Sequence, residues 1–552
     1  MARVLYPRPP AARAGRDPEP LLRLRPVNLA LLALSTAAVT AATSLPASAI
    51  STIETGPSTT TAPYVLPVAD GTSITSLLTV NDAGSADGYE MVGIPDGLGA
   101  VSTGSRTTVL MNHELRPDRG IVRRHGETGA FVSKLVVHKD GRVRKGSDLI
   151  DPGVRFWDYA ANAYSDTPVA PEDYVANPAN PFDHKRNFSR FCSGFLSAPG
   201  QLRTDGANKV GYNGQIYFAN EETGNEGRAF GVTLDGQATQ LPRLGLFSWE
   251  NTIAAPNDTA TTVVMGNEDA QPGEIWVYTG TKQKDGSPVT QAGLTNGRNH
   301  VVKVPGATTD AAFRTAYPVG TKAPFSLQDI EWDQSGKKQN AEAVSEGGLG
   351  LNRIEDGAFN PANKNEYFFL TTEGGDKTPA ATGTRDGGGL WKLTYVDVER
   401  PQLGGTLELV LDGSQTWGDG IRTNKPDNMT IDRAGNLLIQ EDPGGNDHVA
   451  RILSYRIADG ARGVVARFDP ALFGATNPAG TTPDTRAVLT TDEESSGIIQ
   501  LDDGSYLFDA QVHTAKGLPA GTGPGTVQEY VENGQLLRMT VNSFSTVYAA
   551  QP

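Results

Sequence analysis

The sequence predicts an all-β protein, a six-bladed β-propeller with loop-rich insertions. Short runs of β-branched and aromatic residues alternate with turns rich in Gly, Asn, Asp and Pro, and helical periodicity is scarce. One strand-and-turn unit recurs six times at irregular spacing. The single cysteine, Cys192, leaves no internal disulfide framework, so a large hydrophobic core must hold the fold together. A β-helix and two packed sandwiches are the alternative architectures.

Each copy of the unit has the same order. A polar cluster opens a short strand, a turn leads to a more apolar strand that ends on an acidic or amide motif, and a third strand follows a Gly-rich loop. The clearest copy opens at Pro426-Asp427-Asn428, ends its second strand at Gln440-Glu441-Asp442 and has its third strand at 451–456. The first copy opens at Tyr89-Glu90 and ends its second strand at 112–114. The next three open at Cys192, Trp249-Glu250 and Ile354-Glu355, and their second strands end at 220–222, 267–269 and 372–373, respectively. The last copy opens at Glu493-Glu494 and ends its second strand at 509–513.

The segments between the copies complete the expected layout. Residues 51–80 are expected to supply an outer strand that closes the ring of blades. Two insertions, at about 144–190 and 279–350, are rich in loop-forming residues. We therefore expect residues 50–552 to form a single propeller domain that carries both insertions.

Residues 1–49 have the features of a secretory signal. The start is rich in arginine, an apolar run follows from Val27 to about Val39, and Ala47-Ser48-Ala49 is an A-x-A cleavage site. No later stretch is long and apolar enough to cross a bilayer. The expected location is therefore secreted or extracellular, with no stable membrane insertion.

The charge of the chain limits its partners. The net charge is −15, so nucleic acid is not an expected partner. An excess of acidic residues can keep an exported protein soluble or can bind cations, and the positions of the acids decide between these interpretations.

The repeat predicts that acidic residues meet at one end of the channel. In an antiparallel hairpin, the start of the first strand and the end of the second lie at the same edge, so six such edges form a ring. Oxygen-rich sites suit calcium, magnesium or manganese, and a thiolate favours iron. The alternatives are solvated strand-end acids and an inert buried thiol. The expected metal ligands are Cys192, Glu221, Glu222, Glu250, Glu355, Asp427, Glu441 and Glu494.

Two arginines are candidates for binding an anionic substrate. Arg353 lies two residues before Glu355, and Arg385 lies in the Gly-rich loop after Glu373. Each could instead be a solvated surface charge. The sequence has neither a G-x-S-x-G nucleophile motif nor a phosphate-binding P-loop, so a serine nucleophile is not expected.

Taken together, the motifs resemble those of the PhoX-type alkaline phosphatase family. The matching segments are 112–114, 192–194, 221–222, 353–358, 426–436 and 494–497, in the order of that family. The resemblance implies an exported six-bladed propeller that hydrolyses phosphomonoesters with iron and calcium held by carboxylates and a cysteine. It further implies that arginines near the channel mouth orient the phosphate, and that Cys192, Glu222, Glu250, Glu355 and Glu441 hold the metals.

The expected function is therefore that of a secreted, metal-dependent phosphomonoesterase acting on small-molecule phosphate esters. Calcium and iron are the expected cofactors. Two alternatives remain open: a calcium-dependent phytase-like or lactonase-like propeller hydrolase, and a non-catalytic, calcium-stabilised binding module. The sequence does not indicate an oligomeric state.

Overall fold

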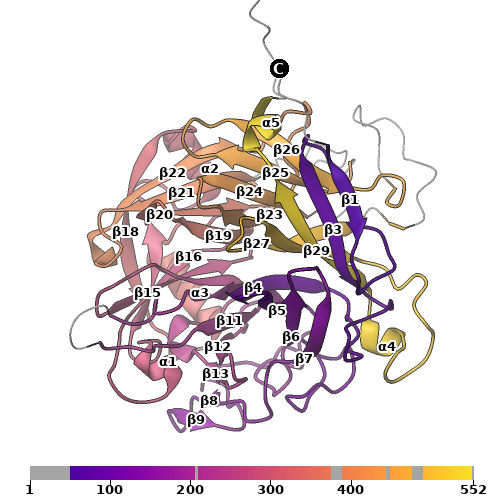
Figure 1. Cartoon of the computed structure of the whole chain (residues 1–552). Helices are drawn as coiled ribbons and strands as arrows, with labels where there is room; N and C mark the ends of the chain where they lie inside the picture. The colour runs from indigo at the N-terminus through magenta and orange to yellow at the C-terminus, as the bar shows by residue number, and fades with distance from the viewer. Residues whose placement is uncertain are drawn as a thin grey trace, which may run out of the picture. The chain divides into compact units, whose positions relative to one another are not determined.

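The computed structural model describes residues 50–204, 209–374, 388–442, 448–474, 489–490 and 492–549. The expected signal segment 1–49 and the candidate Arg385 lie outside these residues. Strands predominate in the described chain, which confirms the all-β prediction (Figure 1). Its α-helices are short: α1 Pro288–Gln291, α2 Asp310–Ala316, α3 Gly336–Ser345, α4 Val527–Tyr530 and α5 Phe544–Ala549.

The described strands form a series of mostly antiparallel sheets. One four-stranded sheet has the order β4 (Pro95–Thr103), β5 (Arg106–His113), β6 (Phe131–His138), β7 (Val143–Asp148). Another has the order β10 (Phe191–Leu196), β11 (Ile216–Glu221), β12 (Ala229–Thr233), β13 (Ala238–Gln240). A nine-stranded sheet has the order β14 (Trp249–Ala254), β15 (Thr261–Glu268), β16 (Ile275–Thr281), β17 (Arg298–Lys303), β18 (Lys322–Ile330), β22 (Gly405–Asp412), β21 (Gly389–Tyr395), β20 (Asn363–Thr371), β19 (Ile354–Asn360).

Two five-stranded sheets contain both early and late parts of the chain. One has the order β2 (Val65–Pro67), β26 (Arg462–Phe468), β25 (Arg451–Arg456), β24 (Asn436–Glu441), β23 (Pro426–Ile431). The other has the order β1 (Thr52–Thr55), β3 (Thr72–Thr79), β29 (Asn533–Val541), β28 (Tyr506–Val512), β27 (Glu493–Gln500). Figure 1 shows the indigo β3 beside the yellow β29. The prediction that residues 51–80 add an outer strand is confirmed, since β3 pairs antiparallel with β29.

The sheets have a propeller-like arrangement. Six strands that each begin a hairpin contact one another in succession, and the last contacts the first; they are β4, β10, β14, β19, β23 and β27. We call these the inner strands. A closed ring of this kind surrounds a channel, and the two ends of the inner strands form its two mouths.

The insertions and the first repeat differ from expectation. Segment 279–350 is not simply a loop, because β17 and β18 join the nine-stranded sheet and α1, α2 and α3 lie within it. Apolar residues of these strands, such as Val301 and Phe325, are buried and pack like those of any blade strand. Segment 144–190 is mostly irregular but contains the hairpin β8 (Phe156–Asp158), β9 (Ala163–Ser165). The first repeat opens at Pro95, not at Tyr89-Glu90, because the left-handed turn at Ile94 (φ 48°) precedes its inner strand.

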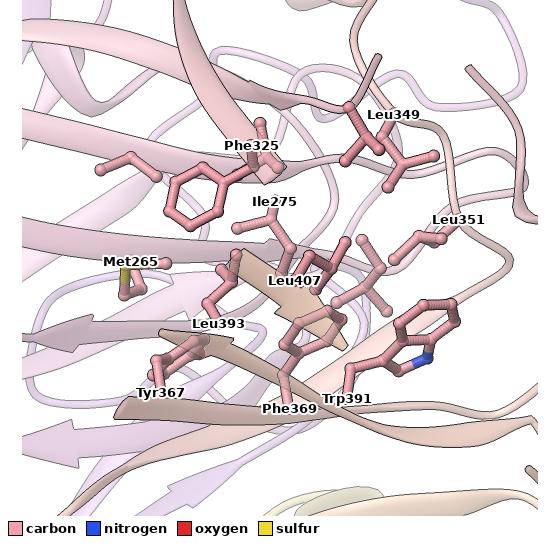
Figure 2. Packing of buried hydrophobic residues seen from close by; sticks show 14 of the residues in the cluster. Met265, Ile275, Phe325, Leu349, Leu351, Tyr367, Phe369, Trp391, Leu393 and Leu407 are labelled. Atoms are coloured by element: carbon pink, nitrogen blue, oxygen red, sulfur yellow. The ribbon is translucent and has the colours of Figure 1, made fainter. Parts of the chain in front are cut away.

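The core lies between neighbouring sets of strands rather than at the channel. In the cluster of Figure 2, Met265 and Ile275 of β15 and β16 pack with Phe369 of β20 and Leu393 of β21, and Phe325 of β18 lies in the same cluster. All five are at most 5% exposed. Burying each such side chain contributes about 1.5–3 kcal/mol. This packing joins each set of strands to the next set around the ring. The inner strands remain to line the channel.

Amide side chains fix the positions of the inner strands. Asn112 Nδ2 donates to the carbonyl of Cys192 at 2.6 Å, and Gln440 Nε2 donates to the carbonyl of Ser496 at 3.2 Å. Asn267 Nδ2 donates in the same way to the carbonyl of Glu355. Each amide is on the second strand of one hairpin and reaches the inner strand of the next. We call these contacts the amide clamps.

Breaking one clamp tests its contribution to stability. Asn267→Ala leaves the Glu355 carbonyl and the Tyr367 hydroxyl, which donates to Asn267 Oδ1 at 2.8 Å, without this partner. We expect the free energy of unfolding to fall by about 1–3 kcal/mol in a denaturant titration. The exposed Asn542 provides the matched control, and Asn542→Ala should change it by less than about 0.5 kcal/mol. Equal losses in the two variants would contradict a clamping role.

Candidate metal centre

The inner strands place one candidate ligand each at the same level of the channel. The second residue of each strand is acidic or a cysteine: Asp96, Cys192, Glu250, Glu355, Asp427 and Glu494. In five of the six strands the pairing register shifts just at this point, as between Pro95 and Leu98 or between Trp249 and Asn251. Such β-bulges redirect side chains. The repeat of the bulge explains how residues far apart in the sequence converge at one end of the ring.

The chain enters four inner strands through a left-handed residue. Ile94, Arg190, Arg353 and Lys425 have φ of 48°, 44°, 56° and 48°, and each lies two residues before a candidate ligand. Non-glycine residues rarely adopt this conformation, and it costs of order 1–3 kcal/mol unless the surroundings enforce it. Its recurrence at equivalent positions indicates that the sharp entry is needed to position the ligand that follows.

Three overlapping groups of side chains could each hold a cation. Their members are Asp96, Glu114 and Cys192; Cys192, Glu222 and Glu250; and Glu250, Glu355 and Asp427. Within each group one ligand atom per residue lies within 4.8 Å of the others. Because Cys192 and Glu250 each belong to two groups, the three form a continuous row, which we call the ligand row.

The electrostatics of the ligand row call for positive charge. Burial, and then Glu355 and Asp96, raises the pKa of Glu250 well above its ordinary value. Burial, and then Asp96 and Glu250, raises the pKa of the Cys192 thiol in the same way. Among the described residues, Glu250 Oε1 is buried without a hydrogen-bond partner. Buried carboxylates stay ionised only when they are paired or bind cations. The donor set fits the expected metals, since carboxylate oxygens suit calcium and a thiolate suits iron.

Two of the predicted metal ligands, Glu221 and Glu441, lie outside the ligand row and form ion pairs instead. Glu221 accepts from Arg228 Nε at 2.6 Å and Nη2 at 2.7 Å, and Glu441 accepts from Arg451 Nε at 2.9 Å and Nη2 at 2.6 Å. Although burial acts to raise the pKa of Glu441, Arg451 and His448 hold it at about 2. Both glutamates end a second strand, and the residue after that end turns to the channel instead. The structure therefore places Glu222 in the ligand row and Glu221 in an ion pair.

Glu494 lies beside the ligand row rather than within its three groups. Its carboxylate accepts from Ser496 Oγ at 2.8 Å, and His513 Nε2 lies 3.9 Å away. Burial is the largest cause of the raised pKa of Glu494. The nearby Asp509 has both carboxylate oxygens buried without hydrogen-bond partners among the described residues.

Asp96 and Asp509 were not predicted from the sequence. Asp96 was missed because the first repeat opens later than expected. A usable signal exists, since Pro95-Asp96-Gly97 is similar to Pro426-Asp427-Asn428. Asp509 belongs to the expected strand end 509–513 but was not among the expected ligands, and the structure places it inside the second strand β28.

Cationic side chains surround the mouth next to the ligand row. Arg190 Nη2 lies 2.6 Å from Glu114 Oε1 and 2.5 Å from Glu222 Oε2. Arg353 binds Asp269 through two hydrogen bonds of 2.9 and 2.7 Å, and its Nη2 lies 3.4 Å from Glu355 Oε1. Beside Arg190 and His513 a cavity of about 430 Å³ opens at this mouth. Guanidinium groups therefore lie at the edge of the row, where they can bind an anion.

The chain is similar to known proteins in sequence and in fold. The family model described as alkaline phosphatase PhoX matches residues 190–508. The solved structure of Pseudomonas fluorescens PhoX in complex with vanadate, a transition state analogue, is 12% identical and has a TM-score of 0.58. The match covers 88% of this chain and 98% of that chain, and it shows a shared fold. The BP39L lectin from Burkholderia pseudomallei, 12% identical, has a TM-score of 0.30 over 76% of this chain and 96% of its own. No curated protein sequence matches the chain.

Two glutamate substitutions should separate ion-pair acids from ligand-row acids. Glu221→Gln weakens the buried pair with Arg228, so we expect the free energy of unfolding to fall by about 3–5 kcal/mol. Glu250→Gln replaces a buried carboxyl group whose ionisation is disfavoured by burial and by the neighbouring acids, so the metal-free protein should not lose stability. Denaturant titration of chelator-treated protein measures both effects. Equal destabilisation by the two variants would show that Glu250 is not built to meet a cation.

Proposed function

The chain belongs to the alkaline phosphatase PhoX family, whose model matches 190–508 of its 552 residues, and we propose that it is a secreted, metal-dependent phosphomonoesterase. Family membership makes the chain a phosphatase, a hydrolase that acts on phosphate esters. The finer proposal, a centre of iron and calcium at the channel, is supported chiefly by the ligand row. A row in which Cys192 and Glu250 each belong to two groups suits several cations side by side.

The residues of the row would have distinct tasks. Cys192 would hold the softer metal, iron, because it is the thiolate donor, whereas Glu250, Glu355 and Asp427 offer only oxygen and would hold calcium. When bound, such a centre supplies Lewis-acid activation of the phosphate ester and compensates charge on the phosphoryl oxygens. No serine nucleophile motif is needed for this chemistry, in keeping with its absence from the sequence.

The protein's own cations would orient the substrate. Arg353 is held in place because it donates two hydrogen bonds to Asp269, so its remaining guanidinium N–H groups have a fixed direction. Guanidinium groups bind phosphate oxygens with defined geometry. Arg190 lies between Glu114 and Glu222 and would be available to the phosphate once cations engage those carboxylates. Arg385 stays a proposed phosphate contact on sequence grounds alone.

The proposed framework for this function is a six-bladed propeller. The ring of six inner strands, each in contact with the next, supports this count. The nine-stranded sheet then counts as two blades, one starting at β14 and one at β19, which β18 joins edge to edge. Residues 50–552 would form this one domain. Export after removal of residues 1–49 is proposed from their sequence. Within the described part of the chain, none of the helices has the length and apolarity of a membrane span. Small phosphate esters are the proposed substrates.

Elemental analysis of the purified mature protein, combined with p-nitrophenyl phosphate hydrolysis, tests the proposal. We expect both iron and calcium, and turnover that a chelator abolishes and the two metals restore. Calcium without turnover would instead indicate a calcium-stabilised binding module. Calcium-dependent turnover without iron would favour a phytase-like or lactonase-like hydrolase, and absence of any metal would refute the metal centre.

Substitution of two members of the row should separate chemistry from folding. We expect Cys192→Ala and Glu355→Gln each to lower kcat by at least about 100-fold, because each removes a metal ligand, while circular dichroism stays unchanged. Asp329→Asn, at an exposed acid outside the row, is the matched control and should keep full activity. Full phosphatase activity in both ligand variants would defeat the assignment.

A further inference from the structure

The channel has a second cavity further along the same inner strands. Its volume is about 400 Å³, and each inner strand contributes to its lining at residues that follow the candidate ligand. Its walls are mixed, with partly buried apolar side chains such as Phe195, Phe359 and Ile499 beside the uncharged polar side chains of Thr430 and Gln500. The strands thus present acids at one level of the channel and a mostly uncharged lining at the next.

A hydrogen-bonded layer separates the two levels. The residues directly after Cys192, Glu250, Glu355 and Asp427 form it, and two hydrogen bonds join them in pairs. Ser193 Oγ donates to Asn428 Oδ1 at 3.0 Å, and Asn251 Nδ2 donates to Asp356 Oδ1 at 2.7 Å. Gly497 N also donates to Asn428 Oδ1, at 3.1 Å. Along each of these four strands, a partnered polar residue therefore lies between the candidate ligand and the apolar residues of the cavity lining.

The lining has no charge left for an ionic ligand. Its ionisable side chains are Asp356 and Arg433. Besides Asn251, Asp356 accepts from the backbone N–H groups of Gly357 at 2.6 Å and Met429 at 3.1 Å. Arg433 lies at the rim and is paired with Asp502 at 2.9 Å. An anion or a cation would therefore lose hydration here without gaining a partner.

We propose that this end of the channel is a binding site for one uncharged, largely apolar small molecule, distinct from the phosphatase site. The volume is that of a small-molecule site, and the lining combines apolar side chains with uncharged polar groups. Water gains few hydrogen bonds from apolar walls, so a ligand that displaces it gains apolar contact at little cost. Gln500 and Thr430, which also line the cavity, can bond a hydroxyl or amine group of the ligand.

Titration of the full mature protein with N-phenyl-1-naphthylamine, an uncharged apolar fluorophore, tests the site. We expect a saturable fluorescence increase with one probe per chain. Ile499→Trp fills the cavity and should weaken binding at least about tenfold by steric exclusion. Val396→Trp, at a residue 65% exposed, is the matched control and should bind as the unmodified protein does.

Three controls keep the outcome clear. Ala100→Phe is a second filling variant in case Ile499→Trp does not fold, and circular dichroism verifies each protein. Phosphate and a chelator should leave probe binding unchanged, because the layer separates the cavity from the ligand row. The proposal would be overturned if the unmodified protein showed no saturable binding, or if both filling variants bound the probe as tightly as the unmodified protein. Displacement of the probe by phosphate would also overturn it. None of these results depends on phosphatase activity.

Discussion

Repulsion between buried like charges is the constraint on which the rest of this structure depends. Seven acidic or thiol side chains meet in three groups at one level of a closed channel. Burial raises the pKa of six of them, Asp96, Cys192, Glu222, Glu250, Glu355 and Asp427, so the protein must hold them together by other means. The closed ring of inner strands, the bulges at five of the inner-strand ligands and the amide clamps supply this restraint. Bound cations would turn the repulsion into attraction, which is the physical basis of the proposed metal centre.

The same alternation that builds a strand divides its acids between two roles. Neighbouring residues on a strand point to opposite sides, and at the end of a second strand this separates Glu221, paired with Arg228, from Glu222 in the row. Glu441, which is paired with Arg451, has the same ion-pair role as Glu221. Stabilising ion pairs and candidate ligands therefore stand side by side in the sequence. The buried arginines strengthen the framework close to the site without neutralising the ligands themselves.

Polarity changes along the inner strands within a few residues. Cys192 faces the ligand row, Ser193 joins the hydrogen-bonded layer and Phe195 lines the apolar cavity. One ring of short strands thus creates two environments that share a wall. Since Asn428 Nδ2 donates to Asp427 Oδ1 at 2.9 Å, the layer also helps to position a ligand of the row.

By itself, the sequence determined the class of the fold, the repeated hairpin, the closing outer strand and the family. Local patterns carry these features, because strand alternation and turn residues act between near neighbours. It also located Cys192, Glu250, Glu355 and Asp427 at equivalent positions of the inner strands, and Glu222 at the end of a second strand. Only the tertiary structure decided which strand-end acid turns inward, since a one-residue shift reverses the side to which a side chain points. It likewise revealed Asp96 and Asp509, which interact electrostatically between the contacting strands β4 and β28 although they are more than 400 positions apart, a proximity that no local pattern encodes.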